Sequence, residues 1–190
     1  MKRVVFVSTC LFVMLGVLGI PTVHANADVV AVKNFRQVLE YLYLTTGVNP
    51  ATADIAQYYA QGSTRLPKEG SVEEVSAPML LTFASLSALF CKNMIQADSL
   101  VVDVSKRQAH SKVDFKKVPS AALTDEVRKS VIEEYAGLFW RRSPSELELA
   151  SLNHAITQAL MGRPDVAVEN SNALLVPCTA VASSLESIIF

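Results

Sequence analysis

The sequence predicts an all-α, single-domain bundle of five to seven helices that is tied by one disulfide bond. Apolar residues recur at three- and four-residue spacing along most of the chain, which is the period of an α-helix. Several of these stretches begin with a capping residue that is followed by proline or glutamate in the first turn, as helix starts do. Two cysteines, Cys91 and Cys178, remain once an N-terminal leader is set aside, and they suggest the covalent tie.

The first 27 residues are typical of a cleaved secretory signal. Lys2 and Arg3 precede an almost continuously apolar run over residues 4–20, and small residues at Ala25 and Ala27 suit a signal peptidase. An uncleaved membrane anchor is the alternative, but the run is short for a bilayer span and no basic stop follows it. We therefore expect a domain over residues 28–190, in the periplasm or outside a bacterial cell, with no stable membrane span.

Charge argues against a nucleic-acid partner. The chain has 17 basic and 18 acidic residues. Two of the basic residues lie in the leader, so the mature domain carries about −3 with neutral histidines. It therefore lacks the basic footprint of a nucleic-acid-binding protein.

The first half of the domain predicts three helices. Apolar residues from Val32 to Tyr43 form one stripe, and Gly47 is a suitable stop. Asn49-Pro50 predicts the start of a short helix, and residues 61–70 predict a loop. A capping box at Ser71–Glu74 and then Pro78 precede a helix over residues 78–98 that is apolar on most sides, as central helices are.

The second half predicts three more helices after a stretch of weak periodicity. Residues 99–122 show no clear pattern; Val101–Val104 suggests a short strand or extended piece, and residues 105–117 suggest an exposed polar loop. Helices are predicted over residues 124–141 and from Ser143-Pro144-Ser145-Glu146 to Gly162. The segment 166–190 predicts a last helix, kinked or restarted at Pro177.

Cys91 and Cys178 are expected to pair, because an exported chain with an even cysteine count favours a disulfide. Such a bridge closes a loop of about 87 residues and removes on the order of 4 kcal/mol of freedom from the unfolded chain. Two separate buried thiols are the alternative.

Complete catalytic and cofactor motifs are absent from the sequence. After the leader only His110 and His154 remain, and no zinc, haem, nucleophile-elbow or phosphate-loop motif is present, so we expect no metal and no cofactor. Glu133 and Glu134 are candidates for a general acid of a helical cell-wall hydrolase, with an exposed helix face as the alternative.

One short segment is a candidate contact surface. Trp140, Arg141 and Arg142 combine a lone tryptophan with two guanidinium groups at a helix end, and such residues are frequent in interface hot spots. The alternative is that Trp140 closes the core while the arginines cap the helix. The polar loop from Lys106 to Lys117 is a second candidate surface.

The segment Leu138–Leu149 resembles the W/F-R-R-x-P-x-x-x-E-L helix junction of large exported bacterial proteins. These include planctomycete-type cytochrome-associated helical modules and proteobacterial proteins with lectin-like domains. Cys178–Ser184 is similar to the helix that closes such modules, and Thr46–Pro50, Arg65–Pro67 and Leu89–Cys91 are similar to their N-terminal half. The resemblance implies an exported helical module; this chain lacks the haem motif and the lectin domain, so neither electron transfer nor sugar binding is implied.

The sequence thus favours an exported, non-enzymatic binding or assembly protein of the cell envelope whose partner is another envelope protein. A helical peptidoglycan hydrolase is the first alternative. A carrier of a small apolar ligand is the second, because the helix around Phe83–Ile95 is rich in apolar residues.

Overall fold

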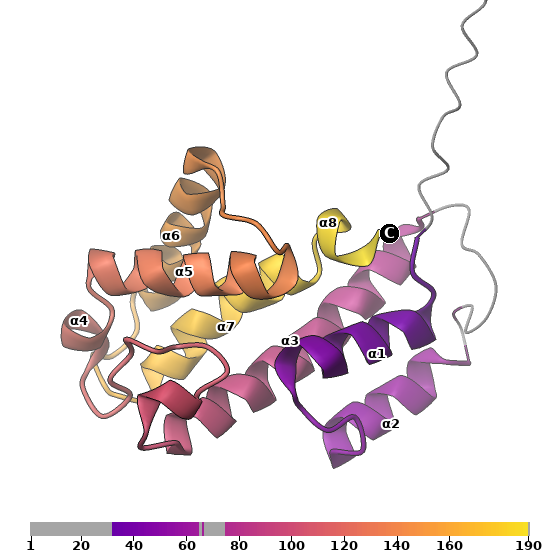
Figure 1. Ribbon diagram of the computed structural model, residues 1–190, viewed down its shortest axis with the longest axis horizontal. Helices are drawn as coiled ribbons and strands as arrows, with labels where there is room; N and C mark the ends of the chain where they lie inside the picture. Colours follow the sequence, from indigo (N-terminus) through magenta and orange to yellow (C-terminus); the bar gives the residue numbers. More distant parts are fainter. Residues whose placement is uncertain (1–31, 65, 67–74, 190) are drawn as a thin grey trace, which may run out of the picture.

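The computed structural model describes residues 32–64, 66 and 75–189, and this part of the chain is an all-α bundle (Figure 1). The predicted signal peptide and the Ser71–Glu74 capping box lie outside the described residues. Six helices have ten residues or more, and two have a single turn. In order they are α1 (Phe35–Thr46), α2 (Ala53–Gly62), α3 (Ala77–Leu100), a 3₁₀ turn (Val104–Lys106), α4 (Pro119–Ala122), α5 (Asp125–Phe139), α6 (Glu146–Leu160), α7 (Glu169–Ala182) and α8 (Leu185–Ile188).

Helices α3 and α7 form the centre of the bundle. They pack against each other; α1 and α2 pack on α3, while α5 and α6 pack on α7 (Figure 1). By length and composition α3 could also cross a membrane. Its side chains Phe83, Leu86 and Phe90 are fully buried among the other helices, which is the placement of a core helix.

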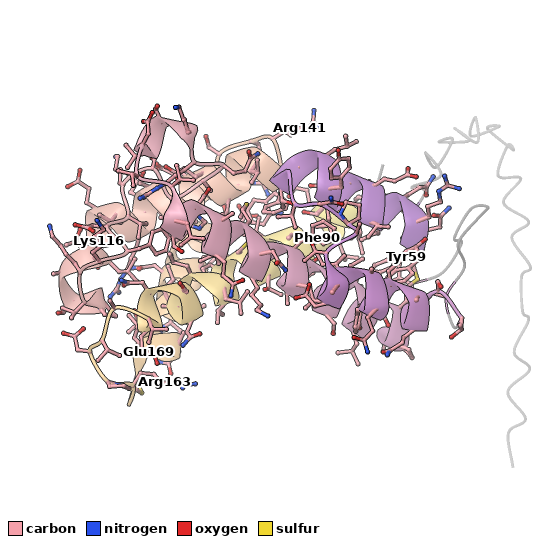
Figure 2. All side chains as sticks on the ribbon, turned by 90° about the horizontal axis from the view of Figure 1, so that it is seen from below. Tyr59, Phe90, Lys116, Arg141, Arg163 and Glu169 are labelled. Atoms are coloured by element: carbon pink, nitrogen blue, oxygen red, sulfur yellow. A yellow bond between two sulfur atoms is a disulfide. The ribbon has the colours of Figure 1, made fainter. Side chains whose placement is uncertain are left out.

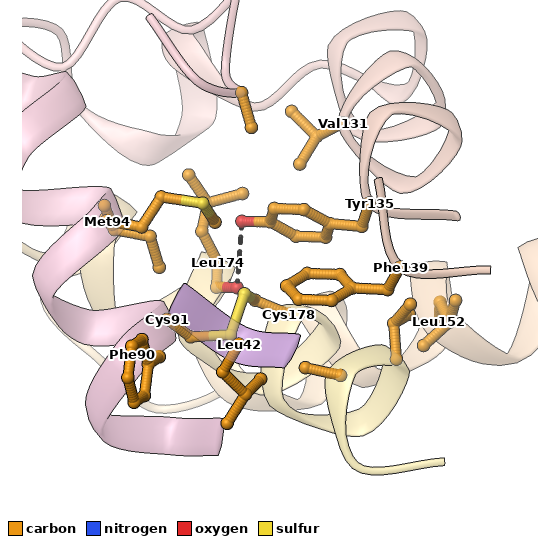
Figure 3. Close-up of a cluster of buried hydrophobic side chains, with 14 of the residues drawn as sticks. Leu42, Phe90, Cys91, Met94, Val131, Tyr135, Phe139, Leu152, Leu174 and Cys178 are labelled. Atoms are coloured by element: carbon orange, nitrogen blue, oxygen red, sulfur yellow. Dashed lines mark hydrogen bonds between the residues drawn. A yellow bond between two sulfur atoms is a disulfide. The ribbon is translucent and has the colours of Figure 1, made fainter. Parts of the chain in front are cut away.

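The predicted disulfide joins the two central helices. Cys91 on α3 and Cys178 on α7 are bonded, and both side chains are fully buried (Figure 3). Leu42, Met94 and Tyr135 belong to the same buried apolar cluster. The covalent link therefore lies in the core, where it connects the N-terminal and C-terminal halves of the domain.

Local signals in the sequence explain where the helices begin and end. Gly47 ends α1 with a left-handed φ of 68°, as predicted. The start of α6 lies two residues later than predicted, because Ser145 rather than Ser143 is the cap. Ser145 accepts from the Glu148 N–H, and the Glu148 carboxylate accepts from the Ser145 N–H at 2.7 Å, which completes a capping box.

The C-terminal segment differs from the single predicted helix. Helix α7 begins at Glu169 and continues through Pro177, and the short α8 follows it. The end of α8 returns to the N-terminal side of the domain, where Lys33 N–H donates to the Ile188 carbonyl at 2.8 Å. Among the described residues the β pairing is limited to an isolated bridge between Val32 and Ile189, so Val101–Val104 is not a strand. The extended alternative is confirmed at Val101 and Asp103, and a 3₁₀ turn begins at Val104.

Two glycines should respond oppositely to alanine. A Cβ at Gly62 lies 2.8 Å from the ring of Phe35, which is fully buried and stacked on Tyr59 and Phe83, so Gly62→Ala should lower the free energy of unfolding by about 1–3 kcal/mol. Gly137 on α5 has open space around it, so Gly137→Ala should raise that free energy by up to about 1 kcal/mol. Urea denaturation of both variants checks the pair, and an unchanged Gly62→Ala variant contradicts the close packing.

Candidate functional site

A buried polar network fixes the segment between α3 and α4, residues 101–118, which we call the loop. His110 is fully buried; its Nδ1 is hydrogen-bonded to Asp98 Oδ2 at 2.8 Å, and its Nε2 is hydrogen-bonded to the Tyr135 hydroxyl at 2.5 Å. Burial raises the pKa of Tyr135 well above its ordinary value, so the hydroxyl keeps its proton. The Leu174 carbonyl lies 3.3 Å from the same hydroxyl (Figure 3). His110 thus connects α3 with α5, and the Tyr135 hydroxyl adds a contact with α7.

Asp98 is the main acceptor of this network. Besides His110, it accepts the N–H groups of Gln108 and Ala109, each at 2.9 Å. Its side chain is almost fully buried, so these bonds compensate for the desolvation of the carboxylate. They also hold His110 at a left-handed φ of 62°, which a non-glycine residue adopts at a cost of about 1–2 kcal/mol. Most of residues 105–117 are exposed as predicted, but the expectation that His110 itself is solvated is wrong.

Arg107 closes the loop from the other side. Its guanidinium group donates to the carbonyls of Val101, His110 and Val113, at distances of 2.7–3.2 Å. It also lies 5.4 Å from the centre of the Phe115 ring. All of these hydrogen-bond acceptors are neutral, so the positive charge of Arg107 is not compensated by a carboxylate in these contacts.

Glu134 anchors the same loop to α5. Its carboxylate accepts from the His110 N–H at 2.6 Å, from the Ser111 N–H at 3.3 Å and from the Ser111 hydroxyl. Both carboxylate oxygens therefore have partners in the loop. Together with Asp98 and Arg107, Glu134 gives the loop a defined shape without regular secondary structure.

The loop and the end of α3 enclose an open groove of about 610 Å³, which we call the α3-loop groove. Three cationic side chains (Arg107, Lys112 and Lys116) and one carboxylate (Asp114) line it. Its lining residues are Ser99, Leu100, Val101, Val102, Val104, Arg107, Ser111, Lys112, Val113, Asp114, Phe115 and Lys116. Leu100 and Val102 are 83% and 88% exposed, so two large apolar side chains stand at its edge in solvent. Lys116 marks this end of the molecule, far from Tyr59 on α2 (Figure 2).

The predicted contact residues Trp140, Arg141 and Arg142 have different surroundings. Trp140 is half-buried, and its Nε1–H donates to the Ser184 hydroxyl at 2.7 Å. Arg142 pairs with Glu148 at 2.7 Å and with Glu186 at 2.5 Å. Arg141 is exposed. Trp140 and Arg142 thus connect the end of α5 to α6 and α8. Trp140 packs against the core, whereas the hydrogen bonds of Arg142 reach Glu148, Glu186 and the Ser143 carbonyl rather than the last carbonyls of α5. The contact surface stays a prediction.

The ion pairs of Arg142 predict an acid sensitivity. Hydrogen bonds from Arg142, and then from Ser145, lower the pKa of Glu148 from its ordinary 4.5 to about 2. A depressed carboxylate pKa stabilises the fold above pH 4.5, and this contribution is lost as the pH falls towards 2. Urea denaturation should therefore show wild type more stable than Glu148→Gln at neutral pH, with the difference vanishing near pH 2. A constant difference at every pH contradicts this assignment.

The hydrolase candidates Glu133 and Glu134 are placed differently from each other. Glu133 is exposed on α5 and pairs with Lys129 at 3.9 Å, whereas Glu134 anchors the loop. Neither lines the α3-loop groove. Both carboxylate oxygens of Glu134 are already occupied by hydrogen bonds from His110 and Ser111 of the loop.

The described residues give little support to a metal site or to a carrier of a small apolar ligand. No group of three or more histidine, cysteine, aspartate or glutamate side chains is close enough to hold a metal ion in this part of the chain. The apolar residues of α3 that suggested a carrier, Phe83, Phe90 and Ile95 among them, pack into the core.

Comparison with known proteins adds no family. No family model, no curated protein and no solved structure matches this chain.

Proposed function

We propose that this chain is an exported, non-enzymatic binding module of the bacterial cell envelope, and that its partner docks in the α3-loop groove. The groove carries the proposal because exposed apolar residues and uncompensated cations lie together on a loop of fixed shape. Exposed apolar side chains grouped on one surface are typical of interaction sites. Buried hydrogen bonds already hold the loop in shape. Binding therefore avoids the entropic cost of ordering the loop, which favours affinity.

Export is supported by the leader pattern and by the cysteine pair. A disulfide persists in oxidising compartments, and Cys91 and Cys178 are bonded in the core. If the leader is cleaved after Ala25 or Ala27, the protein recovered from the periplasm should begin at Asn26 or Asp28. N-terminal sequencing of that fraction checks the point, and an uncleaved chain in the cytosol contradicts it.

Photocrosslinking in the host tests the docking site. A photoreactive amino acid replaces Val102 at the edge of the groove, Leu147 near Arg142, or Leu44 on α1; all three are highly exposed in the structure, at 88%, 78% and 79%. Binding in the groove predicts a discrete crosslinked product from position 102, and none from position 44. A product from position 147 alone instead favours the Trp140–Arg142 surface and contradicts docking in the groove.

The hydrolase alternative is separated by a direct assay. Incubation of the purified protein with peptidoglycan should release no fragments if the chain is a binding module. Fragment release that is lost in Glu133→Gln or Glu134→Gln contradicts the proposal.

A further inference from the structure

The charges of the α3-loop groove select an anionic occupant. Arg107, Lys112 and Lys116 line it, against one carboxylate, that of Asp114. The charge of Asp114 is already compensated, since one oxygen accepts the Lys116 N–H at 3.1 Å and the other lies 3.6 Å from Lys117 Nζ. Across the described residues, Lys112 and Lys116 take part in no ion pair. An otherwise weakly acidic domain thus has a concentrated positive site here, which attracts a negatively charged partner.

Arg107 adds a directed donor to this positive charge. A guanidinium group has five N–H donors. Four of them reach the carbonyls of Val101, His110 and Val113, which leaves one Nη2–H. Because the backbone bonds fix the guanidinium plane, a carboxylate that enters the groove meets a donor that is already oriented.

The apolar lining requires that the occupant also carry apolar groups. Val113 is buried at the groove, Phe115 is half-buried there, and Leu100 and Val102 are exposed at its edge. Covering the last two side chains removes apolar surface from water, which favours binding. A purely polar anion gains nothing from these contacts.

Shape distinguishes a peptide from a membrane surface. A volume of about 610 Å³ falls within the range of clefts that hold ligands or side chains. A flat lipid surface reaches the protruding Leu100 and Val102 but not the recessed Val113 and Arg107. A peptide can place its backbone at the edge and its side chains inside the hollow.

We infer that the α3-loop groove binds an acidic peptide segment with interspersed apolar side chains, presented by a partner protein. This inference rests on the proposed function and names the partner's chemistry. Carboxylates of the segment meet Lys112, Lys116 and Arg107, while its apolar side chains cover Leu100 and Val102.

Fluorescence anisotropy with a labelled peptide of alternating leucine and aspartate tests the inference on the disulfide-bonded mature chain. The peptide should bind, and added salt should weaken it. Lys112→Glu/Lys116→Glu should bind about tenfold more weakly or worse, because two attractions become repulsions. The control Lys92→Glu/Lys129→Glu has the same net charge but changes residues outside the groove, and it should bind as wild type does. Circular dichroism confirms that both variants are folded.

Control peptides and lipid vesicles define the results that would overturn the inference. Peptides with serine in place of leucine, or lysine in place of aspartate, should bind at least severalfold more weakly. Equal loss in both charge-reversal variants overturns the inference. A second result would also overturn it. In that result the protein sediments with phosphatidylcholine–phosphatidylglycerol vesicles, its sedimentation requires Lys112 and Lys116, and no peptide binds. If peptide binding fails but the crosslink from position 102 persists, the partner chemistry is wrong and the proposed function stands.

Discussion

Replacement of Asp98 by alanine is expected to lower the free energy of unfolding by about 3–5 kcal/mol, since it leaves several buried donors without an acceptor. The carboxylate accepts from His110 Nδ1 and from the N–H groups of Gln108 and Ala109 within a buried site. Loss of the acceptor also releases His110 from its left-handed backbone conformation. Urea denaturation followed by circular dichroism measures the effect.

The same loop offers a matched control for this prediction. Asp103 also accepts hydrogen bonds, from the N–H and hydroxyl of Ser105, but its side chain is exposed. Asp103→Ala should therefore lower the free energy of unfolding far less than Asp98→Ala does. Equal losses of unfolding free energy in Asp98→Ala and Asp103→Ala contradict the role given to the buried network.

Peptide binding should fall in Asp98→Ala as well, because the loop loses its fixed shape.

Removal of the disulfide is expected to have an effect of similar size. Cys91→Ala/Cys178→Ala opens a loop closed across a sequence separation of 87, and the chain-entropy model gives a loss of about 4 kcal/mol. Most of the loss arises from the greater freedom of the unfolded chain, so the structure of the core should change little. Wild type in the presence of a reductant should unfold at about the same urea concentration as the double variant.

Thiol titration provides the control for that prediction. The chain without residues 1–27, denatured and unreduced, should have no free sulfhydryl, and Cys91→Ala alone should expose one. Two reactive thiols in wild type, or no stability difference between wild type and Cys91→Ala/Cys178→Ala, contradict covalent closure of the core.

The helices were predictable from the sequence because their signals are local. The apolar stripe that ends at Gly47 and the weak periodicity of residues 99–122 both correspond to what the structure contains. The shift in the start of α6 has a local cause too: Ser143 and Ser145 compete as caps, and Glu148 selects Ser145 by completing the capping box.

The groove was not predictable, since it depends on contacts between distant residues. His110 lies in a polar stretch, and nothing nearby in the sequence indicates that Asp98 and Tyr135, 12 and 25 residues away, enclose it. The same holds for Trp140, whose hydroxyl partner Ser184 is 44 residues further along the chain.

Amide hydrogen exchange at Ala109 most directly tests whether buried carboxylates hold the loop in a preformed shape. Its N–H donates to the buried Asp98, whereas the Ser105 N–H donates to the exposed Asp103. We predict that Ala109 exchanges nearly as slowly as the core amide of Phe90 on α3, while Ser105 exchanges rapidly. Exchange of Ala109 as fast as that of Ser105 would show that the loop opens freely, and the groove could not then be a preformed site.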